Sequence, residues 1–263
     1  MGLYKILKKP FFGQFMVKWK NPLSDEETTT WSKAWIKSKT KAQLRVWYKP
    51  TSQKEVKATV VLAHSMGKPA KGEFLKTGYA EELLANGYNV VLFDFNGFGE
   101  STMGNWMFHN DVLAVRDFTV TTFQKTNLYY HGVSFGSNWG TVAITELDNP
   151  FKKIILESSP VNLPEFWIHF PFAYKMLKFF YVIGPFYKRY ANFEEHLRHT
   201  KNCDHILLIT SDADIYTPVS MAERMKEAAN TKAEVKIFHG SRHALAILRD
   251  RDTYIKTVLD FFG

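Results

Sequence analysis

Residues 127–147 read NLYYHGVSFGSNWGTVAITEL, and this stretch decides the fold. A short apolar run leads through Gly132-Val133-Ser134-Phe135-Gly136 into a helical pattern. This order predicts a buried strand, a sharp turn that carries Ser134, and a helix. Glycines two residues before and two after Ser134 let the neighbouring backbones approach closely. The stretch therefore predicts a serine held on a tight turn at the end of a strand.

Similar apolar runs of about six residues recur between longer helical patterns. They are ATVVLA at 58–63, NVVLFDF at 89–95, KIILES at 153–158, HILLIT at 205–210 and EVKIFH at 234–239. Runs that are apolar on both faces are typical of parallel strands covered by helices on both sides. Residues 30–49 add two extended runs, TWSKAWIKSK and AQLRVWYK, which predict an antiparallel hairpin. We expect an α/β fold with a mostly parallel sheet of about eight strands and helices on both faces.

One stretch of about forty residues, 160–200, interrupts this alternation, and long connections of this kind are usually functional. Residues 166–193 hold 12 aromatic residues in 28 positions, together with four Lys and Arg. We expect residues 160–200 to form a helical cap inserted above the sheet. The chain then divides into a basic aromatic segment, 1–30, a core of 31–159 and 201–263, and this cap. Apolar walls suit a lipophilic acyl group, although the same rings can also serve to seat the cap.

Composition narrows the class of protein. The chain has 263 residues, of which 45% are hydrophobic and 23% charged, a balance that excludes disordered and collagen-like chains. Cys203 is the only cysteine, which excludes an internal disulfide and a cysteine-rich zinc site. We find neither a signal peptide nor an apolar run long enough to span a bilayer. These features are typical of a cytoplasmic protein.

Positive charge gathers at the N-terminus. Residues 1–57 carry 13 Lys and Arg against four Asp and Glu, so the rest of the chain is close to neutral. Residues 1–20 mix aromatic and aliphatic side chains with five lysines, which is typical of an interfacial amphipathic segment, and Pro10 is expected to break any continuous helix there. Two interpretations stay open, peripheral membrane contact through residues 1–20 and packing of the rings on the body. A nucleic-acid partner is not expected, because no recognition motif is present.

The serine at 134 has the partners that its chemistry needs. A serine hydroxyl is a poor nucleophile until a base accepts its proton and a carboxylate orients that base. Asp214, in SDADIYTP, follows the run HILLIT at the sheet edge where the sites of open α/β sheets collect, and Asp212 is the competing carboxylate. His243, in HGSRHALAIL, follows the last predicted strand and is expected to open the final helix. Ser134, Asp214 and His243 are therefore the candidate catalytic residues.

An oxyanion that forms at such a serine needs two backbone N–H donors. Phe135, which follows the serine, is expected to supply one of them. The second should come from the loop His64-Ser65-Met66-Gly67, where Met66 is the candidate and Ser65 the alternative. The chemistry requires neither a metal nor an organic cofactor, and we assign no metal-binding or cofactor-binding residue.

Five pieces together resemble a known superfamily. They are LAHSMG at 62–67, DFNGFGES at 94–101, GVSFGS at 132–137, DADIYTP at 212–218 and GSRHA at 240–244. In this order the chain resembles the α/β-hydrolases, and within them the lysophospholipase, monoacylglycerol lipase and serine-aminopeptidase-like group. The resemblance covers about residues 30–262 and implies a structural role for Asp94 and Ser101. One departure is Ser65, because the family usually has glycine there, and it concerns the oxyanion loop.

From the residues and this resemblance we expect a serine esterase that is lipase-like and acts on small-molecule carboxylic esters with a lipophilic acyl group, through an acyl-enzyme. The same three side chains serve acyltransferases, thioesterases and amidases, so these stay open as alternatives. An alternative of another class is a binding protein that has kept the fold without the activity. Retention of all three candidate side chains opposes that last alternative.

Overall fold

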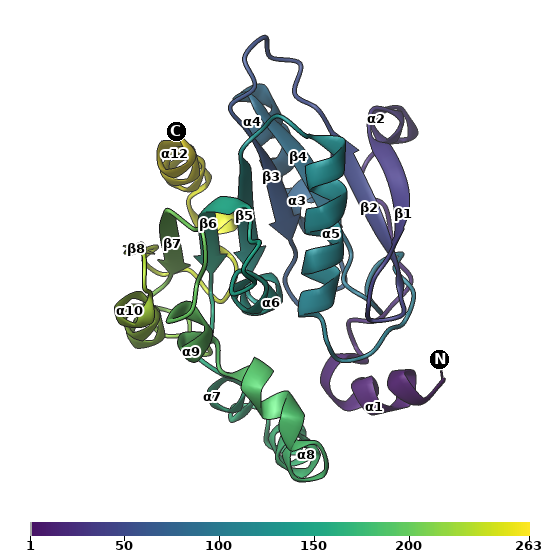
Figure 1. Cartoon of the computed structure of the whole chain (residues 1–263), viewed down its shortest axis with the longest axis vertical. Coiled ribbons are helices and arrows are strands. Elements are labelled where there is room, and N and C mark those ends of the chain that lie inside the picture. Colours follow the sequence, from purple (N-terminus) through teal and green to yellow (C-terminus); the bar gives the residue numbers. More distant parts are fainter. Residues whose placement is uncertain (1) are drawn as a thin grey trace.

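The computed structural model describes residues 2–263, which form an eight-stranded sheet with helices on both faces (Figure 1). The strands are β1 (Ser32–Lys37), β2 (Gln43–Lys49), β3 (Ala58–Ala63), β4 (Tyr88–Phe93), β5 (Leu128–Val133), β6 (Phe151–Glu157), β7 (His205–Thr210) and β8 (Lys232–Ile237). Their order across the sheet is β1-β2-β4-β3-β5-β6-β7-β8. β1 and β2 form an antiparallel hairpin, and β2 pairs antiparallel with β4. The six strands β4, β3, β5, β6, β7 and β8 all run parallel to one another. The predicted α/β fold and mostly parallel sheet are confirmed.

The helices connect the strands and flank the sheet. They are α1 (Gly2–Phe12), α2 (Asp25–Thr29), α3 (Gly72–Lys76), α4 (Tyr79–Ala85), α5 (His109–Thr122), α6 (Phe135–Ala143), α7 (Leu163–Trp167), α8 (Pro171–Ile183), α9 (Phe193–Leu197), α10 (Val219–Ala228), α11 (Ala246–Arg249) and α12 (Arg251–Phe262), with a 3₁₀ helix η1 (Pro185–Ala191). Across residues 2–263, each helix is too short or too polar to cross a bilayer.

Two apolar cores lie on opposite faces of the sheet. One packs α5, α6 and α10 against the sheet, and the other packs α3, α4 and α12 against the opposite face (Figure 1). Every residue of β3, β4 and β5 is buried, as expected for central strands covered on both sides. The candidate serine follows one of these strands.

Several strand boundaries differ from the expected ones by one or two residues, and those of β8 and β4 have a clear physical reason. β8 begins at Lys232 and ends at Ile237, two residues earlier than the apolar run 234–239 indicates. As the edge strand it exposes polar side chains such as Lys232 and Glu234, so apolar character does not mark its start. β4 ends at Phe93 rather than at residue 95, because Asp94 and Phe95 enter the loop that follows it.

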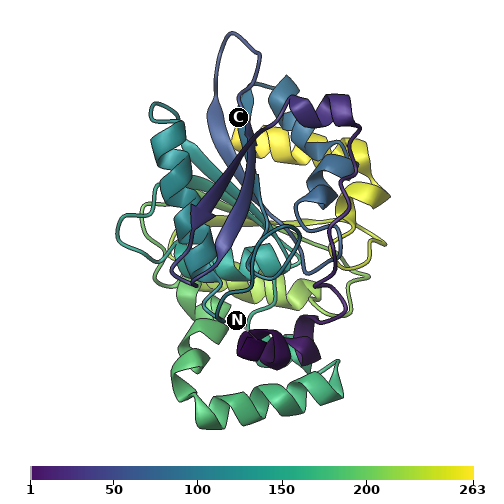
Figure 2. The same ribbon diagram turned by 90° about the vertical axis from the view of Figure 1, so that its right-hand side faces the viewer.

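Residues 160–200 lie outside the sheet, between β6 and β7. They contain α7, α8, η1 and α9, and they lie at one end of the molecule beside α1 (Figure 2). The side chains of Asn162 and Asn192 cap α7 and α9, and their backbones pair in a single antiparallel bridge. This bridge joins the outgoing and returning chain at the base of the segment. The function of the segment as a cap stays a prediction.

The N-terminal segment is built into the body. α1 packs against α8 and continues through Pro10, so the expected break at Pro10 is wrong. Pro10 lies in the last turn, and the burial of Phe11 and Phe12 in the main core holds that turn in place. Met1, the first residue of the segment 1–20 for which the sequence leaves both membrane contact and packing on the body open, lies outside the described residues.

A buried lysine also ties α1 to the body. Lys8 is fully buried and donates to the side chain of Asn96 and, at 2.9 Å, to the carbonyl of Asn105. Asn96 in turn donates to the Asp111 carboxylate at 2.6 Å. Burial lowers the pKa of Lys8 from 10.5 to about 7. A charged side chain this deep needs polar partners, and here they come from the loop after β4 and from α5.

We expect Phe12→Ala to destabilise the fold by about 3 to 5 kcal/mol, the usual range for a deleted core phenylalanine. Phe12 packs against Phe98, Phe108 and Phe135 with ring-centroid distances of 5.9, 5.8 and 5.5 Å. Urea unfolding gives the free energy. Ile6→Ala on the same helix is the control, because Ile6 is 70% exposed and should change stability by less than about 0.5 kcal/mol. Equal effects from the two substitutions would contradict docking of α1.

Candidate active site

The turn between β5 and α6 holds Ser134 in a strained conformation. Its φ is +49° and its ψ −101°, a region that residues other than glycine rarely occupy. The Ser134 N–H donates to the carbonyl of Glu157 at 2.8 Å, which ties the turn to the end of β6. A Cβ at Gly132 would lie 2.6 Å from the backbone of Gly136, and a Cβ at Gly136 would collide with the carbonyl of Ala63. Both glycines are therefore required by close backbone approach.

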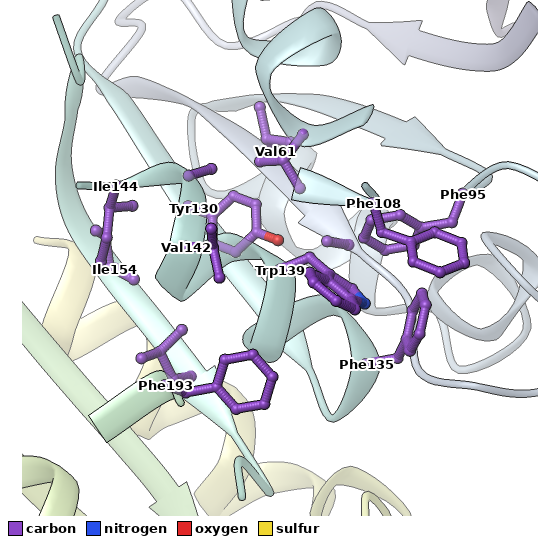
Figure 3. Close-up of a cluster of buried hydrophobic side chains, with 14 of the residues drawn as sticks. Val61, Phe95, Phe108, Tyr130, Phe135, Trp139, Val142, Ile144, Ile154 and Phe193 are labelled. Atoms are coloured by element: carbon purple, nitrogen blue, oxygen red, sulfur yellow. The ribbon is translucent and has the colours of Figure 1, made fainter. Parts of the chain in front are cut away.

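Aromatic packing fixes the helix that follows the turn. The ring of Phe135 lies 4.8 Å from that of Phe108 and 5.1 Å from that of Phe95, both nearly perpendicular to it. Trp139, one turn further along α6, lies 5.3 Å from Phe108 (Figure 3). The two edge-to-face contacts of Phe135 add to the stabilisation that comes from burial of the rings. The first turn of α6, and with it Ser134, has little freedom to move.

The structure brings Ser134, His243 and Asp214 into one hydrogen-bonded chain. Ser134 Oγ lies 2.8 Å from His243 Nε2, and His243 Nδ1 lies 2.7 Å from Asp214 Oδ2. The three residues follow β5, β8 and β7, so they meet at the carboxyl edge of the parallel sheet. Because the carboxylate accepts from Nδ1–H, Nε2 is left to accept the serine proton. This is the arrangement that activates a hydroxyl.

Asp214 is buried and held by its own loop. Its Oδ1 accepts from the N–H groups of Tyr216 and Thr217 at 2.9 and 3.0 Å, and its Oδ2 accepts from the Thr217 hydroxyl at 2.5 Å. Burial alone raises the pKa of Asp214, but the hydrogen bonds from His243 and Thr217 and the charge of His243 outweigh it and lower the pKa below 3.8. Asp214 is therefore a carboxylate at neutral pH.

The competing carboxylate, Asp212, points elsewhere. It accepts from His239 Nδ1 and from the N–H of Gly240, both at 2.7 Å, at the surface. Its carboxylate contacts His239 rather than His243. Of the two candidates, the structure therefore joins Asp214 to the imidazole.

His243 lies in a loop, and the expectation that it opens the final helix is wrong. The short helix α11 begins at Ala246, and the final helix α12 begins only at Arg251. Ala244, at φ +56°, donates its N–H to Ser158 Oγ at 3.0 Å, and this contact anchors the loop beside the site. A loop is compatible with the role of His243, because the hydrogen bonds and not a helix set the direction of its ring.

Two residues that support the site, Thr217 and Ser158, are not among the candidates from the sequence. Thr217 lies in a local sequence pattern, because an aspartate in a turn commonly accepts hydrogen bonds from the residues that follow it. Asp214 does so with Tyr216 and Thr217. Ser158, at φ +48°, directly follows β6. Its partner Ala244 is 86 positions away, so no local pattern reveals that contact.

The loop after β3 explains how serine replaces glycine at position 65. Ser65 donates its N–H to Glu73 Oε1 at 2.7 Å and its hydroxyl to Oε2 at 2.6 Å. Its φ is not positive, so the added side chain does not strain the backbone. The Ser65 N–H is already engaged, whereas the N–H groups of Met66 and Phe135 donate to no acceptor within residues 2–263. The geometry thus leaves Met66 and Phe135, and not Ser65, free to bind an oxyanion.

Glu73 and His64 hold this loop from two sides. Burial raises the pKa of Glu73 from 4.5 to about 7, although the hydrogen bonds from Ser65 oppose the rise. His64 Nε2 accepts from the N–H of Phe95 at 3.1 Å, which places the ring proton on Nδ1, 2.6 Å from the Ser65 carbonyl. Burial lowers the pKa of His64, in agreement with a neutral ring. The loop is therefore preorganised.

The stretch DFNGFGES forms a buried turn beside this loop. Asp94 accepts from the ammonium of Lys71 at 2.6 Å and from the N–H of Glu100 at 2.9 Å, and the Ser101 hydroxyl donates to the Asp94 carbonyl at 2.6 Å. Gly99 has φ +52°, and a Cβ there would collide with the Asp94 carboxylate. These contacts give Asp94 and Ser101 structural partners, in keeping with the role that the resemblance implies for them.

Two cavities reach Ser134. The first, of about 280 Å³, lies between α1, α6 and the segment 160–200 and is lined almost entirely by apolar side chains, among them Leu7, Phe11, Trp167 and Phe180. The second, of about 610 Å³, includes His243 and is lined in addition by polar groups such as Glu73, Glu157 and Tyr79. Met66 lines both. Among residues 2–263, no group of three or more His, Cys, Asp or Glu side chains is placed to hold a metal ion.

Comparisons with known proteins give the family. Residues 54–194 match the family described as serine aminopeptidase, S33. The chain belongs to this family of α/β hydrolases. The match includes the loop at 64–67 and Ser134, whereas Asp214 and His243 lie beyond it. No curated protein sequence matches this member of the family.

Solved structures share the fold of this S33 family member at low identity. An esterase from Pyrococcus furiosus is 19% identical over 93% of this chain and 97% of its own, with a TM-score of 0.70. An esterase from Exiguobacterium antarcticum is 15% identical over 88% and 99%, with a TM-score of 0.64. An α/β serine hydrolase from Xanthomonas campestris, described as having no lid, is 16% identical over 88% and 93%, with a TM-score of 0.65. These similarities support the fold.

We expect Glu73→Gln to gain stability relative to the unmodified chain as pH rises. Between pH 4.5 and about 7 the folded chain keeps a proton on Glu73 that the unfolded chain has lost. The unmodified fold therefore becomes less stable across this window, and the glutamine does not titrate. From about pH 5 to about pH 8 the difference in unfolding free energy should move in favour of Glu73→Gln by roughly 2 to 3 kcal/mol.

Urea unfolding at both pH values measures this difference, and Glu55→Gln, at an exposed loop position, is the control. A difference between Glu73→Gln and the unmodified chain that does not change with pH would mean that Glu73 is ionised throughout.

Proposed function

We propose that the protein is a serine hydrolase that cleaves carboxylic esters with a lipophilic acyl group through an acyl-enzyme. The hydrogen-bonded chain from Ser134 through His243 to Asp214 carries this proposal. Membership of an α/β-hydrolase family supports the reaction class. The apolar cavity beside Ser134 supports the kind of acyl group.

In the first step the Ser134 hydroxyl gives its proton to His243 Nε2 while Oγ attacks the ester carbonyl carbon. The Asp214 carboxylate stabilises the imidazolium that forms. When the tetrahedral intermediate collapses, His243 returns the proton to the departing alkoxide, which leaves as the alcohol, and the acyl group stays on Ser134. Water then repeats the sequence with His243 as base, and the carboxylic acid is released. Every proton that moves is held by His243.

The negative charge of the tetrahedral intermediate needs fixed donors. The free N–H groups of Met66 and Phe135 suit this role, because both residues line the apolar cavity together with Ser134. The Glu73 carboxylate and the His64 ring hold the Met66 loop before substrate arrives. Donors that are held in place before the reaction need no reorganisation during it.

The two cavities suit the two halves of an ester. The aromatic lining of the smaller cavity favours a lipophilic acyl chain, and its volume of about 280 Å³ lies near the lower end of the range for ligand sites. The larger cavity contains polar side chains and suits the alcohol portion. Residues 160–200 contribute the outer walls and act as the cap over Ser134. The chemistry involves no metal or organic cofactor.

A second candidate is hydrolysis of an amide, which the description of the family as serine aminopeptidase favours. The same three residues perform both reactions, so a matched ester and amide with one acyl group separate them. Acyl transfer to an added alcohol and thioester cleavage use the same acyl-enzyme and are read out by product analysis. A binding protein without activity would not need Ser134, His243 and Asp214 within bonding distance of one another.

Ser134→Ala should lower kcat for a lipophilic ester by about 10⁶, the size of loss found when a serine nucleophile is removed. The substitution removes the atom that forms the acyl-enzyme. Steady-state turnover of a chromogenic ester series with increasing acyl length measures it, with Ser52→Ala, at an exposed loop position, as the control. Full turnover by the Ser134→Ala protein would refute the proposal.

The two neighbouring aspartates provide a matched pair. Asp214→Asn should lower kcat by about 10⁴, because an amide no longer stabilises the imidazolium or fixes its tautomer. Asp212→Asn should leave kcat within about threefold, because Asp212 bonds His239 at the surface. The comparison uses the same ester at the same pH. Equal losses in the two proteins would show that Asp214 has no special role.

A further inference from the structure

One face of the segment 160–200 is apolar and exposed. Of 16 large apolar side chains exposed in the described residues, seven fall between residues 168 and 187. Six of them form what we call the docking face: Phe172, Phe179, Val182, Ile183, Phe186 and Tyr187. Val182 is 79% exposed and Phe172 68%. In α8 these side chains recur at helical spacing, so they share one side of the helix. Contiguous apolar surface of this kind marks an interaction site.

The charges around the docking face have a single sign. Residues 166–193 contain Lys175, Lys178, Lys188 and Arg189 and no acidic residue, and all four cations are exposed. The neighbouring helix α1 adds exposed Lys5 and Lys9 and likewise has no acidic residue. Apolar side chains interleaved with Lys and Arg match a surface that offers hydrocarbon beneath anionic groups.

The docking face adjoins the apolar cavity. Ile183 and Tyr187 are exposed and also line the cavity that contains Ser134, and Tyr4 and Leu7 of α1 line it as well. Figure 2 shows α1 and α8 side by side at this end of the molecule, and the two helices are in contact. Molecules entering from the docking face would meet the cavity between α1 and α8.

We infer that this face binds the surface of an anionic lipid bilayer, with α8 and η1 lying in the headgroup region. The described side chains of residues 4–20 do not supply such a face alone, because Phe11 and Phe12 are buried and Ile6 is the only strongly exposed apolar side chain among residues 4–12. A second copy of the chain fits less well. A twofold contact would bring the same cations of both copies together, with no acidic residue of the face to pair them.

This inference goes beyond the proposed function, because binding to lipid is measured without turnover. Ser134→Ala should bind vesicles as the unmodified chain does, so a failure of the esterase proposal leaves the binding test intact. Conversely, an active esterase that ignores lipid would remove the inference alone.

The test is flotation of the full chain with vesicles of phosphatidylcholine, with and without equimolar phosphatidylglycerol. The variant Phe172→Ser/Phe179→Ser/Val182→Ser removes three apolar side chains that line neither cavity. It should bind anionic vesicles about tenfold or more weakly than the unmodified chain. Lys175→Ser/Lys178→Ser/Lys188→Ser should weaken binding to anionic vesicles and leave the weak binding to neutral ones unchanged.

Two matched controls keep the result specific. Val56→Ser/Val120→Ser/Leu147→Ser removes three exposed apolar side chains elsewhere, and Lys54→Ser/Lys125→Ser/Lys232→Ser removes three exposed lysines elsewhere. Both should bind like the unmodified chain. Turnover of a short soluble ester, or circular dichroism if no ester is turned over, shows that each variant is folded.

Two results would overturn the inference. One is an absence of binding to anionic vesicles by the unmodified chain. If light scattering then shows a dimer of the unmodified chain that the apolar variant does not form, the docking face binds a second copy of the chain instead of lipid. The other is binding by the apolar variant that equals that of its control.

Discussion

The hydrogen bond between Ser134 and His243 depends on a backbone conformation that serine rarely adopts. Positive φ at Ser134 persists only where the surrounding structure over-determines it. The turn is held by the bond from its N–H to the end of β6, by the close approach of two glycines, and by the packed rings of α6. The stability of the central strands thus fixes the serine, and the loops after β7 and β8 bring the other two side chains to it.

Carboxylates at this edge of the sheet differ because their surroundings differ. Asp214 is buried among donors and has a lowered pKa, whereas Glu73, also enclosed but with fewer donors, has a raised one. Asp214 orients His243, and Glu73 holds Ser65 where the family usually has glycine. The departure at position 65 therefore has a local compensation eight residues away in the same loop and helix.

Much of the arrangement could be predicted from the sequence because its signals are local. Apolar runs revealed the buried strands, and spacing after each strand indicated Ser134, Asp214 and His243, which the structure brings together. Long-range contacts could not be predicted in this way. The docking of α1 involves hydrogen bonds from Lys8 to partners about ninety positions away in the sequence. The predicted helix break at Pro10 was wrong because tertiary packing outweighs the local effect of the proline. The start of the edge strand β8 could not be predicted from apolar character, because its first residues carry polar side chains that face solvent.

The proposed function requires that the His243 imidazole makes the Ser134 hydroxyl reactive, and covalent labelling tests this most directly. A fluorophosphonate with an alkyl chain reacts with serines that are activated in this way, and peptide mass mapping locates the adduct. We expect one adduct, on Ser134, and its loss in His243→Ala. Labelling of Ser134 at an unchanged rate in His243→Ala, or no labelling of the folded chain, would contradict the proposed function.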